Sequence, residues 1–313
     1  MTVFLSTLNQ MGFLILLIAA GYVLAKWDFV EGAGAKILSK LENYLFIPAL
    51  VLSTFMGNFT VKTFNIAWKY LLVGSVVVGV SAVFAVFVSK LCTRDDYIRK
   101  IYTYGLSFSN FGFMGNAVVM ALFPDIFMEY LIYVLPFWTL IYVWGVPYLL
   151  MPSGEKKSIV SGLKKLVNPM FISMIIGMLI GVFAIPLPDF VGSAVSSMAN
   201  CMSPVAMLLT GMTIAKINLK ATFKNVSIYA VSIIRLLLMP LIAVALLMVI
   251  KLPYELALCT VCALAMPLGL NTVVVPSAYG KDTSVAAGMA LISHLLSLAT
   301  IPVVFMIFQN LVK

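Results

Sequence analysis

The sequence predicts an all-helical membrane protein with ten transmembrane helices, arranged as two inverted repeats of five. Composition is the first observation: 63% of the 313 residues are hydrophobic, 10% are charged, and the mean hydropathy is +1.10. A soluble domain is about 45–50% apolar and about 25% charged. Apolar stretches of about 20 residues, enough to cross a hydrocarbon core of roughly 30 Å, recur along the whole chain. A similarity between the two halves is the third observation.

Short polar separators that hold most of the charges divide the apolar stretches, such as CTRDDYIRK at 92–100. No separator is long or polar enough to form a domain outside the membrane. The first stretch has no basic region before it and no cleavage site after it, so it is expected to remain as a span. The ten expected spans are 7–25, 37–57, 66–91, 97–123, 128–151, 167–185, 190–215, 225–250, 254–278 and 284–311.

Lys and Arg are distributed unevenly over the two sets of loops. If the N-terminus is outside, the inward loops hold 15 of the 20 Lys and Arg residues. The four on the outward side are Lys62, Lys69, Lys251 and Lys313. Because excess positive charge marks cytoplasmic loops, both termini are predicted to lie outside. These loops explain the net charge of +9, so it needs no nucleic acid partner.

The two halves of the chain share a pattern. GNAVVMALFPD at 115–125 resembles LNTVVVPSAYGKD at 270–282, and aligning Asn116 with Asn271 gives an offset of 155. Pro48 and Pro204 repeat with an offset of 156. Since five is odd, two such halves enter the membrane from opposite sides and form an inverted repeat. The expected division is a first repeat at 1–151, a cytoplasmic linker at 152–166 and a second repeat at 167–313.

Two spans contain helix-breaking residues at corresponding places. The fourth is interrupted by Asn110, Gly112, Gly115 and Asn116, and the ninth by Pro267, Gly269 and Asn271. Proline removes a backbone donor and glycine loosens the helix. The freed peptide groups cannot face lipid, so they line a cavity or are buried in protein. Paired breaks in inverted halves indicate a transporter's site at the membrane midplane; a packing kink is the alternative, since Gly and Pro are common in membrane helices.

These motifs resemble those of a known family. The pattern N-x-G-F-M-G at 110–115, RLLLMP at 235–240 and the tail MPLGLNTVVVPSAYGKD with LLSLATIP are similar to the bacterial auxin efflux carrier family, whose relatives include plant PIN auxin exporters and bacterial malonate and malate carriers. The resemblance covers essentially the whole chain. It implies a scaffold and a transport domain that moves as an elevator, the fold of bile-acid and sodium/proton transporters, with broken helices 4 and 9 crossing at the site. The family usually has proline where this chain has Ala117, so the first break is expected to be softer.

Charge within the spans is scarce. All eleven acidic residues fall in loops or within about two turns of a span end, so the paired carboxylates of cation antiporters are missing. Arg235 lies about ten residues into the eighth span, where a charge costs on the order of 2.5–3.5 kcal/mol. It either binds substrate or a coupling ion, or it caps carbonyl groups of a broken helix. In both cases the positive charge is expected to favour an anion.

Polar side chains complete the set of candidate residues. His294, the single histidine, is either a proton relay or a hydrogen-bonded packing residue. Asn43, Asn200 and Ser203 either join helices through hydrogen bonds or supply oxygen ligands to Na⁺. The expected substrate-binding set is Asn43, Asn110, Asn116, Arg235, Pro267 and Asn271. Asn116 and Asn271 are expected to face each other and bind a carboxylate, because each side chain offers two donors and an acceptor.

The leading interpretation is a secondary or facilitative carrier that moves a small organic anion, a carboxylate or an auxin-like molecule, across the cytoplasmic membrane by alternating access. H⁺ and Na⁺ are candidate coupling ions, a homodimer is a candidate assembly, and no cofactor or metal is expected. The sequence has no nucleotide-binding loop, and one histidine without midplane acids argues against an enzyme. A membrane sensor that uses a transporter fold is the alternative; it would be expected to carry a signalling domain.

Overall fold

The computed structural model describes residues 2–30, 32–152, 163–215 and 226–312. This part of the chain is helical, with one isolated antiparallel bridge and no strand. Within it, six helical segments are long and apolar enough to cross a membrane, and three shorter apolar helices accompany them. The prediction of an all-helical, multi-pass membrane protein is therefore confirmed. Most of the expected linker at 152–166, and the lysines at 216, 220 and 224, lie outside the described residues.

The helices follow one another with short connections. In the first half of the chain they are α1 (Thr2–Lys26), α2 (Gly32–Leu41), the π-helical turn η1 (Glu42–Phe46), α3 (Ile47–Asn58), α4 (Val61–Cys92), α5 (Asp96–Ser107), the π-helical turn η2 (Phe111–Gly115), α6 (Asn116–Leu122), the 3₁₀ turn η3 (Pro124–Ile126), α7 (Phe127–Tyr133), α8 (Leu135–Leu140) and the π-helix η4 (Ile141–Leu150). In the second half they are α10 (Pro169–Val182), α11 (Asp189–Ala215), α13 (Val226–Ile233), the π-helical turn η5 (Ile234–Leu238), α14 (Met239–Ile250), α15 (Tyr254–Ala265), α16 (Asn271–Ala278) and α17 (Ser284–Leu311).

Local sequence sets several helix starts and one clear stop. The side chains of Thr60, Asp95 and Asn168 accept hydrogen bonds from backbone N–H groups three residues further on, at 3.3, 2.9 and 3.0 Å. Such N-caps satisfy donors that have no acceptor within the helix. After α14 the backbone turns into the left-handed region at Lys251, where φ is 51°.

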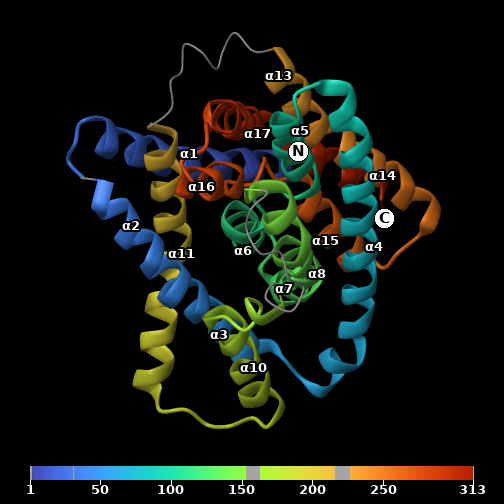
Figure 1. The fold of residues 1–313 in the computed structure, drawn as a ribbon. Helices are drawn as coiled ribbons and strands as arrows, with labels where there is room; N and C mark the ends of the chain where they lie inside the picture. The colour runs from blue at the N-terminus through green and yellow to red at the C-terminus, as the bar shows by residue number, and fades with distance from the viewer. Residues whose placement is uncertain (1, 31, 153–162, 216–225, 313) are drawn as a thin grey trace.

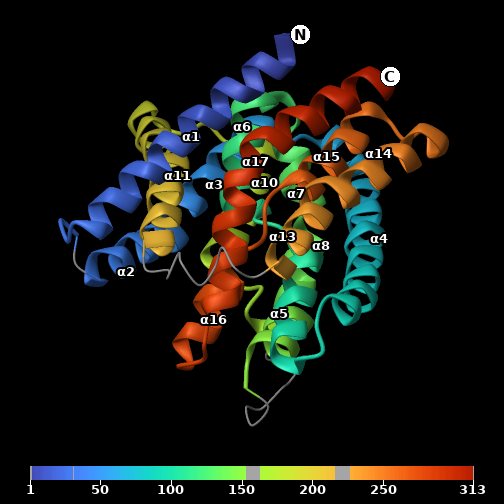
Figure 2. The same cartoon turned by 90° about the horizontal axis from the view of Figure 1, so that it is seen from above.

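The helices form two groups that lie side by side (Figure 1). In one group α1 packs along α11, and α3 packs against α10 and α11. In the other, α4 contacts α5, α7 and α8, and α14 contacts α15. α17 joins the groups, because it contacts both α1 and α13. Figure 2 shows both ends of the chain on the same side of the molecule.

Backbone touches backbone where α1 crosses α11. A Cβ atom at Gly21 would overlap the carbonyl oxygen of Leu208, and one at Gly211 would overlap the carbonyl oxygen of Ile18. Small residues at such a crossing are typical of membrane helices, because close approach of the backbones supplies most of the attraction between them. These two glycines therefore set how closely α1 and α11 approach.

Glu42 differs from the sequence-based expectation for acidic residues. The run of α2, η1 and α3 begins at Gly32, which places Glu42 ten residues into it rather than near its end. Its side chain is fully buried, with 0% exposure. The expectation that every acid lies close to a span end does not hold for this residue, because the helical run begins earlier than its hydropathy suggested.

Candidate functional site

The breaks in two helical runs meet inside the molecule. α5 ends at Ser107 and helix resumes at Phe111, while α15 ends at Ala265 and helix resumes at Asn271. Ser109 and Leu268 form the isolated antiparallel bridge. Next to it, the N–H of Asn110 donates to the carbonyl oxygen of Pro267 at 2.7 Å, and the N–H of Gly269 donates to that of Phe108 at 3.3 Å. Backbone groups freed by each break thus bind the other break.

The two hydrogen bonds beside the bridge are related by symmetry. The bridge joins residues 109 and 268, which are 159 apart, and adding 159 to Asn110 or subtracting it from Pro267 gives Gly269 and Phe108. The register at the crossing therefore differs by four residues from the offset of 155 predicted from the asparagines. The reason is that helix resumes at different points relative to the two asparagines, five residues before Asn116 but at Asn271 itself.

The first break is also shorter than the sequence suggested. Gly112 and Gly115 belong to the π-helical turn η2 rather than to the interruption, because glycine permits a break without enforcing one. Their small size serves packing: a Cβ at Gly112 would lie 2.7 Å from the ring of Trp138, and one at Gly115 would overlap the hydroxyl of Tyr130. Gly269 lies at the crossing itself, where a Cβ would approach the carbonyl oxygen of Phe108 to 3.1 Å.

Arg235 lies between the ends of α5 and α15 and is 0% exposed. Its Nη1 donates to the carbonyl oxygen of Leu106 at 2.8 Å, its Nη2 to Ala263 at 3.2 Å and its Nε to Met266 at 3.4 Å. Each helix C-terminus carries roughly half a negative charge, so two of them balance one guanidinium. The geometry is that of the capping alternative, and the positive charge is opposed by carbonyl dipoles rather than left free for an anion.

Three hydroxyl groups satisfy other backbone groups at the breaks. Ser109 Oγ donates to the carbonyl oxygen of Ala263 at 2.7 Å, and Tyr130 Oη donates to that of Phe111 at 3.1 Å. Ser293 Oγ accepts from the N–H of Leu268 at 3.2 Å. Sequence reasoning missed these residues, because a serine or tyrosine in an apolar helix carries no signal of the backbone group that it meets.

His294 bonds to the first break in a defined tautomer. Its Nδ1 lies 2.7 Å from the carbonyl oxygen of Ala290 and its Nε2 lies 3.0 Å from Nδ2 of Asn110. A carbonyl oxygen can only accept, so Nδ1 carries the hydrogen and Nε2 accepts from the Asn110 amide. This arrangement fits a neutral imidazole that orients Asn110, since a second ring hydrogen on Nε2 would point at the amide hydrogens.

Asn116 and Asn271 have different surroundings. Asn271 Nδ2 donates to Tyr104 Oη at 2.9 Å. Asn116 is 3% exposed, and its side-chain oxygen has no hydrogen-bond partner among the described residues. The hydrogen bonds of the described chain do not join the two asparagines. An unpaired buried acceptor is costly, so the oxygen of Asn116 is a group that a ligand with an N–H or O–H could satisfy.

The remaining polar candidates lie away from the crossing. Asn43 is exposed, and its Nδ2 donates to the carbonyl oxygen of Ser39 at 2.7 Å. Asn200 lines a cavity of about 220 Å³ between α3, α11 and the segment from α6 to α7, whereas Ser203 does not. The polar side chains of this cavity are Ser53, Thr54, Asn58, Ser196 and Asn200. The described residues contain no group of three or more His, Cys, Asp or Glu side chains suited to a metal ion.

Comparison with known proteins gives one match. The sequence model of a family described as "Membrane transport protein" matches residues 6–161 and 156–305. Together the two matches extend over nearly the whole chain. None of the curated proteins matches the sequence.

Proposed function

Because this chain belongs to the membrane transport protein family, the family of the auxin efflux carriers, we propose that it moves a small organic anion across the cytoplasmic membrane by alternating access. The resemblance noted from the sequence motifs is confirmed, and transmembrane transport follows as the class of function. The proposed substrate is a carboxylate or an auxin-like molecule. A proton or sodium ion is the proposed coupling ion, and a homodimer the proposed assembly.

The observation that carries the proposal is the pair of helix breaks joined by backbone hydrogen bonds. The C-terminal ends at the crossing are occupied by Arg235. The N-terminal ends of η2 and α16 remain, and the first N–H groups of any helix have no acceptor within it. Such ends attract anions through aligned N–H groups and the helix dipole. We place the substrate there, with Asn110, Asn116 and Asn271 beside its polar groups.

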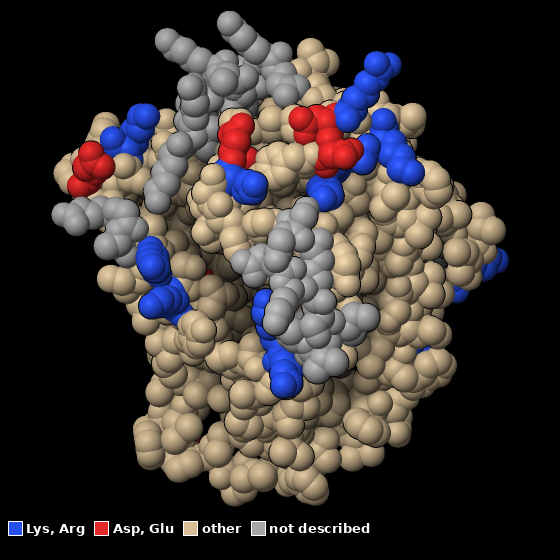
Figure 3. All heavy atoms as spheres, in the orientation of Figure 1, with Lys and Arg blue, Asp and Glu red and all other residues tan. Residues whose placement is uncertain are grey.

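The proposed architecture is ten spans in two inverted repeats, with helices 4 and 9 broken and both termini outside. The symmetric hydrogen bonds at the crossing support the inverted repeat, and both chain ends lie on the same side in Figure 2. In Figure 3 more Lys and Arg than Asp and Glu side chains appear on the face that the view presents, as a cytoplasmic face would show. The polar cavity beside α6 supports a path between the site and one side of the membrane.

Counterflow of radiolabelled carboxylates and of an indole carboxylate into proteoliposomes tests the function. Asn116→Ala and Asn271→Ala are expected to lower transport about tenfold or more, since a hydrogen bond to a charged group contributes roughly 1.5–3 kcal/mol. Asn65→Ala is the matched control, because Asn65 is exposed on α4. Imposed proton and sodium gradients identify the coupling ion. Well-folded variants that transport normally would move the site elsewhere, and wild-type vesicles without counterflow of any carboxylate would refute the anion carrier.

A further inference from the structure

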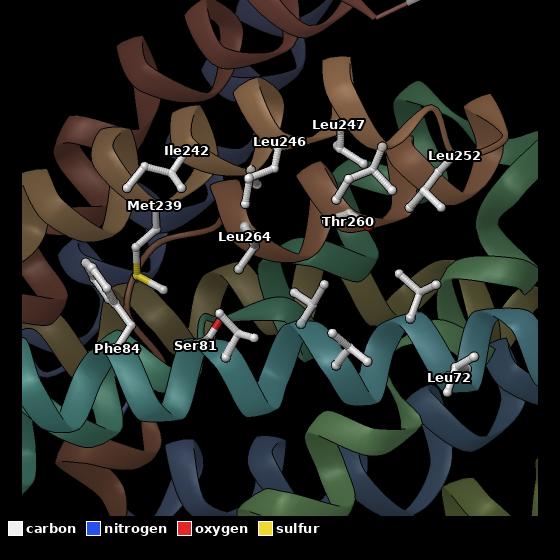
Figure 4. Close-up of a pocket in the computed structure, with 16 residues that line it drawn as sticks. Leu72, Ser81, Phe84, Met239, Ile242, Leu246, Leu247, Leu252, Thr260 and Leu264 are labelled. Carbon is white, nitrogen blue, oxygen red and sulfur yellow. The ribbon is translucent and has the colours of Figure 1, made fainter.

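An apolar groove runs between α4 and α14, with α15 beneath it (Figure 4). It holds about 350 Å³. Val76 and Val80 of α4 and Leu246 of α14 are 57%, 62% and 53% exposed, so the groove opens on the outer surface of the helices. The lining side chains are Leu72, Val73, Val76, Val77, Val80, Ser81, Phe84, Met239, Ile242, Ala243, Leu246, Leu247, Ile250, Leu252, Thr260 and Leu264.

The lining suits a hydrocarbon and not the substrate anion. Ser81 and Thr260 are the only lining residues with a polar side chain. The hydroxyl of Thr260 is already used, because it donates to the carbonyl oxygen of Leu256 and accepts from Tyr133 Oη, both at 3.0 Å. A charged ligand would therefore lose its hydration in this groove without gaining partners.

The dimensions of the groove fit one extended chain. Leu72 and Leu252 lie at one end and Phe84 and Met239 at the other (Figure 4), and Leu72 to Phe84 is a rise of about 18 Å along α4. Dividing 350 Å³ by this length gives a cross-section of roughly 20 Å². A helix with side chains is about 10–12 Å wide and needs several times that area. A single acyl chain fits, whereas a helix from a second copy does not.

Basic residues stand at one end of the groove. Lys251 falls between the lining residues Ile250 and Leu252, and Lys69 precedes Leu72 by one turn of α4. Both are exposed, and Lys69 Nζ lies 6.0 Å from the ring centroid of Trp68. They are two of the four Lys residues assigned to the outward side. An apolar channel that ends at two ammonium groups matches a phospholipid, whose phosphate marks the end of its acyl chains.

We propose that this groove binds one acyl chain of a membrane phospholipid, with the lipid phosphate held by Lys69 and Lys251. Thr260 and Leu264 at the base of the groove belong to α15, the half-helix that leads into the crossing. A bound chain fills the space between α4 and α14 and supports α15 from the membrane side. The lipid site does not depend on the identity of the transported substrate.

The test uses the full chain, purified in detergent and stripped of lipid. Phosphatidylglycerol or diacylglycerol with the same chains is added, and bound lipid is counted by native mass spectrometry while thermal unfolding is followed. Val80→Trp fills the groove. Val83→Trp is the matched control, because Val83 has nearly the same exposure, 59%, on the same helix but does not line the groove. We expect phosphatidylglycerol to bind and stabilise the wild type and Val83→Trp, but not Val80→Trp.

The phosphate contacts have their own variant. Lys69→Gln with Lys251→Gln is expected to weaken phosphatidylglycerol binding about tenfold or more, and diacylglycerol is expected to bind the wild type about as weakly. If Val80→Trp does not fold, Leu246→Trp and its control Val249→Trp replace the pair, since only Leu246 lines the groove. Equal lipid binding by groove-filling and control variants would overturn the proposal. So would a double Lys variant that binds like the wild type, or a dimer that only the groove-filling variant loses.

Discussion

Arg235 and Glu42 are both fully buried, and each lies in a π-helical turn. A π turn displaces one residue from the regular helix and often occurs where a side chain has a special task. Arg235 meets three carbonyl oxygens, whereas neither carboxyl oxygen of Glu42 has a partner among the described residues. An isolated buried carboxylate is costly and takes up a proton instead. The guanidinium is thus compensated by its surroundings, and the carboxyl by becoming neutral.

Arg235→Met is expected to lower stability by about 3–5 kcal/mol, because it leaves buried carbonyl groups without donors. Arg235→Lys keeps the charge but not the planar set of donors, so an intermediate loss is expected. Thermal unfolding of the purified variants in detergent measures both. If Arg235→Met is as stable as the wild type and only transport is lost, the side chain binds substrate and does not cap the helices.

Glu42→Gln is expected to be at least as stable as the wild type, because the amide has nearly the same shape and cannot ionise. The difference should grow as the pH is raised, since ionising an unpaired buried carboxyl reduces the free energy of unfolding. The charged or titratable groups on the helices packed against η1 are Lys36, Lys40, Asp189 and Cys201 within the described chain, and all four are exposed. Melting curves between acidic and alkaline pH, with Glu255→Gln as the exposed control, measure the effect. A strong destabilisation by Glu42→Gln would mean that an ionised carboxylate stabilises the fold.

At the scale of helices, the contact between α1 and α11 depends on the absence of side chains. Gly211→Ala places a methyl group against the carbonyl oxygen of Ile18, and we expect a loss of about 1–3 kcal/mol, as for overpacking in a core. Gly192→Ala is the matched control on the same helix, because a Cβ there meets nothing within 4 Å. Ala favours a helix over Gly by about 1 kcal/mol, so this control is expected to be neutral or stabilising. Equal melting temperatures of the two variants would contradict the close contact.

The helix breaks show which signals a sequence carries. Pro267 and Gly269 mark the interruption that the structure has after Ala265, because proline forbids the regular hydrogen bond. The interruption in the fourth helical run was placed too broadly, since Asn and Gly allow a helix to resume. The partners of Arg235 could not be predicted: they are backbone carbonyls of residues 28 to 129 positions away, and only the folded chain brings them together.

Burial was the least predictable property of the site residues. Asn43 and Glu42 are neighbours in the sequence, yet Asn43 is exposed and Glu42 is buried. Hydropathy identifies a helix that is apolar on all sides but does not tell which face packs against protein. Asn110 and His294 were both expected at the site, and their hydrogen bond, across 184 positions, had no sequence signature.

At the scale of the whole molecule, the predicted topology places Arg94 and Lys281 in the cytoplasm and Lys62 and Asp189 outside. Single cysteines at these positions, in a chain whose Cys92 and Cys201 are replaced by Ser, should react with an impermeant maleimide only from the assigned side of intact cells or inverted vesicles. Cys259 and Cys262 are buried and stay in place. Labelling of either pair from the opposite side would require a different number of spans.

A reporter fused to the C-terminus gives an independent measure of the same topology. An even number of spans from an outward N-terminus leaves the C-terminus outside, so a reporter active only in the cytoplasm is expected to be silent. The same reporter inserted after Lys281 serves as the positive control, because that loop is assigned to the cytoplasm. Strong activity of the C-terminal fusion would reverse the assignment.

The backbone contact between α1 and α11 also limits how the molecule can deform. Two helices without side chains between them cannot slide, because a shift of one residue would bring a Cβ atom against a carbonyl oxygen. This pair then works as a stator, a fixed frame against which other helices move. Sliding surfaces need side chains that can repack, and such surfaces lie where α1 meets α17 and α6 and where α11 meets η2. Any displacement that carries cargo across the membrane is thereby confined to those contacts.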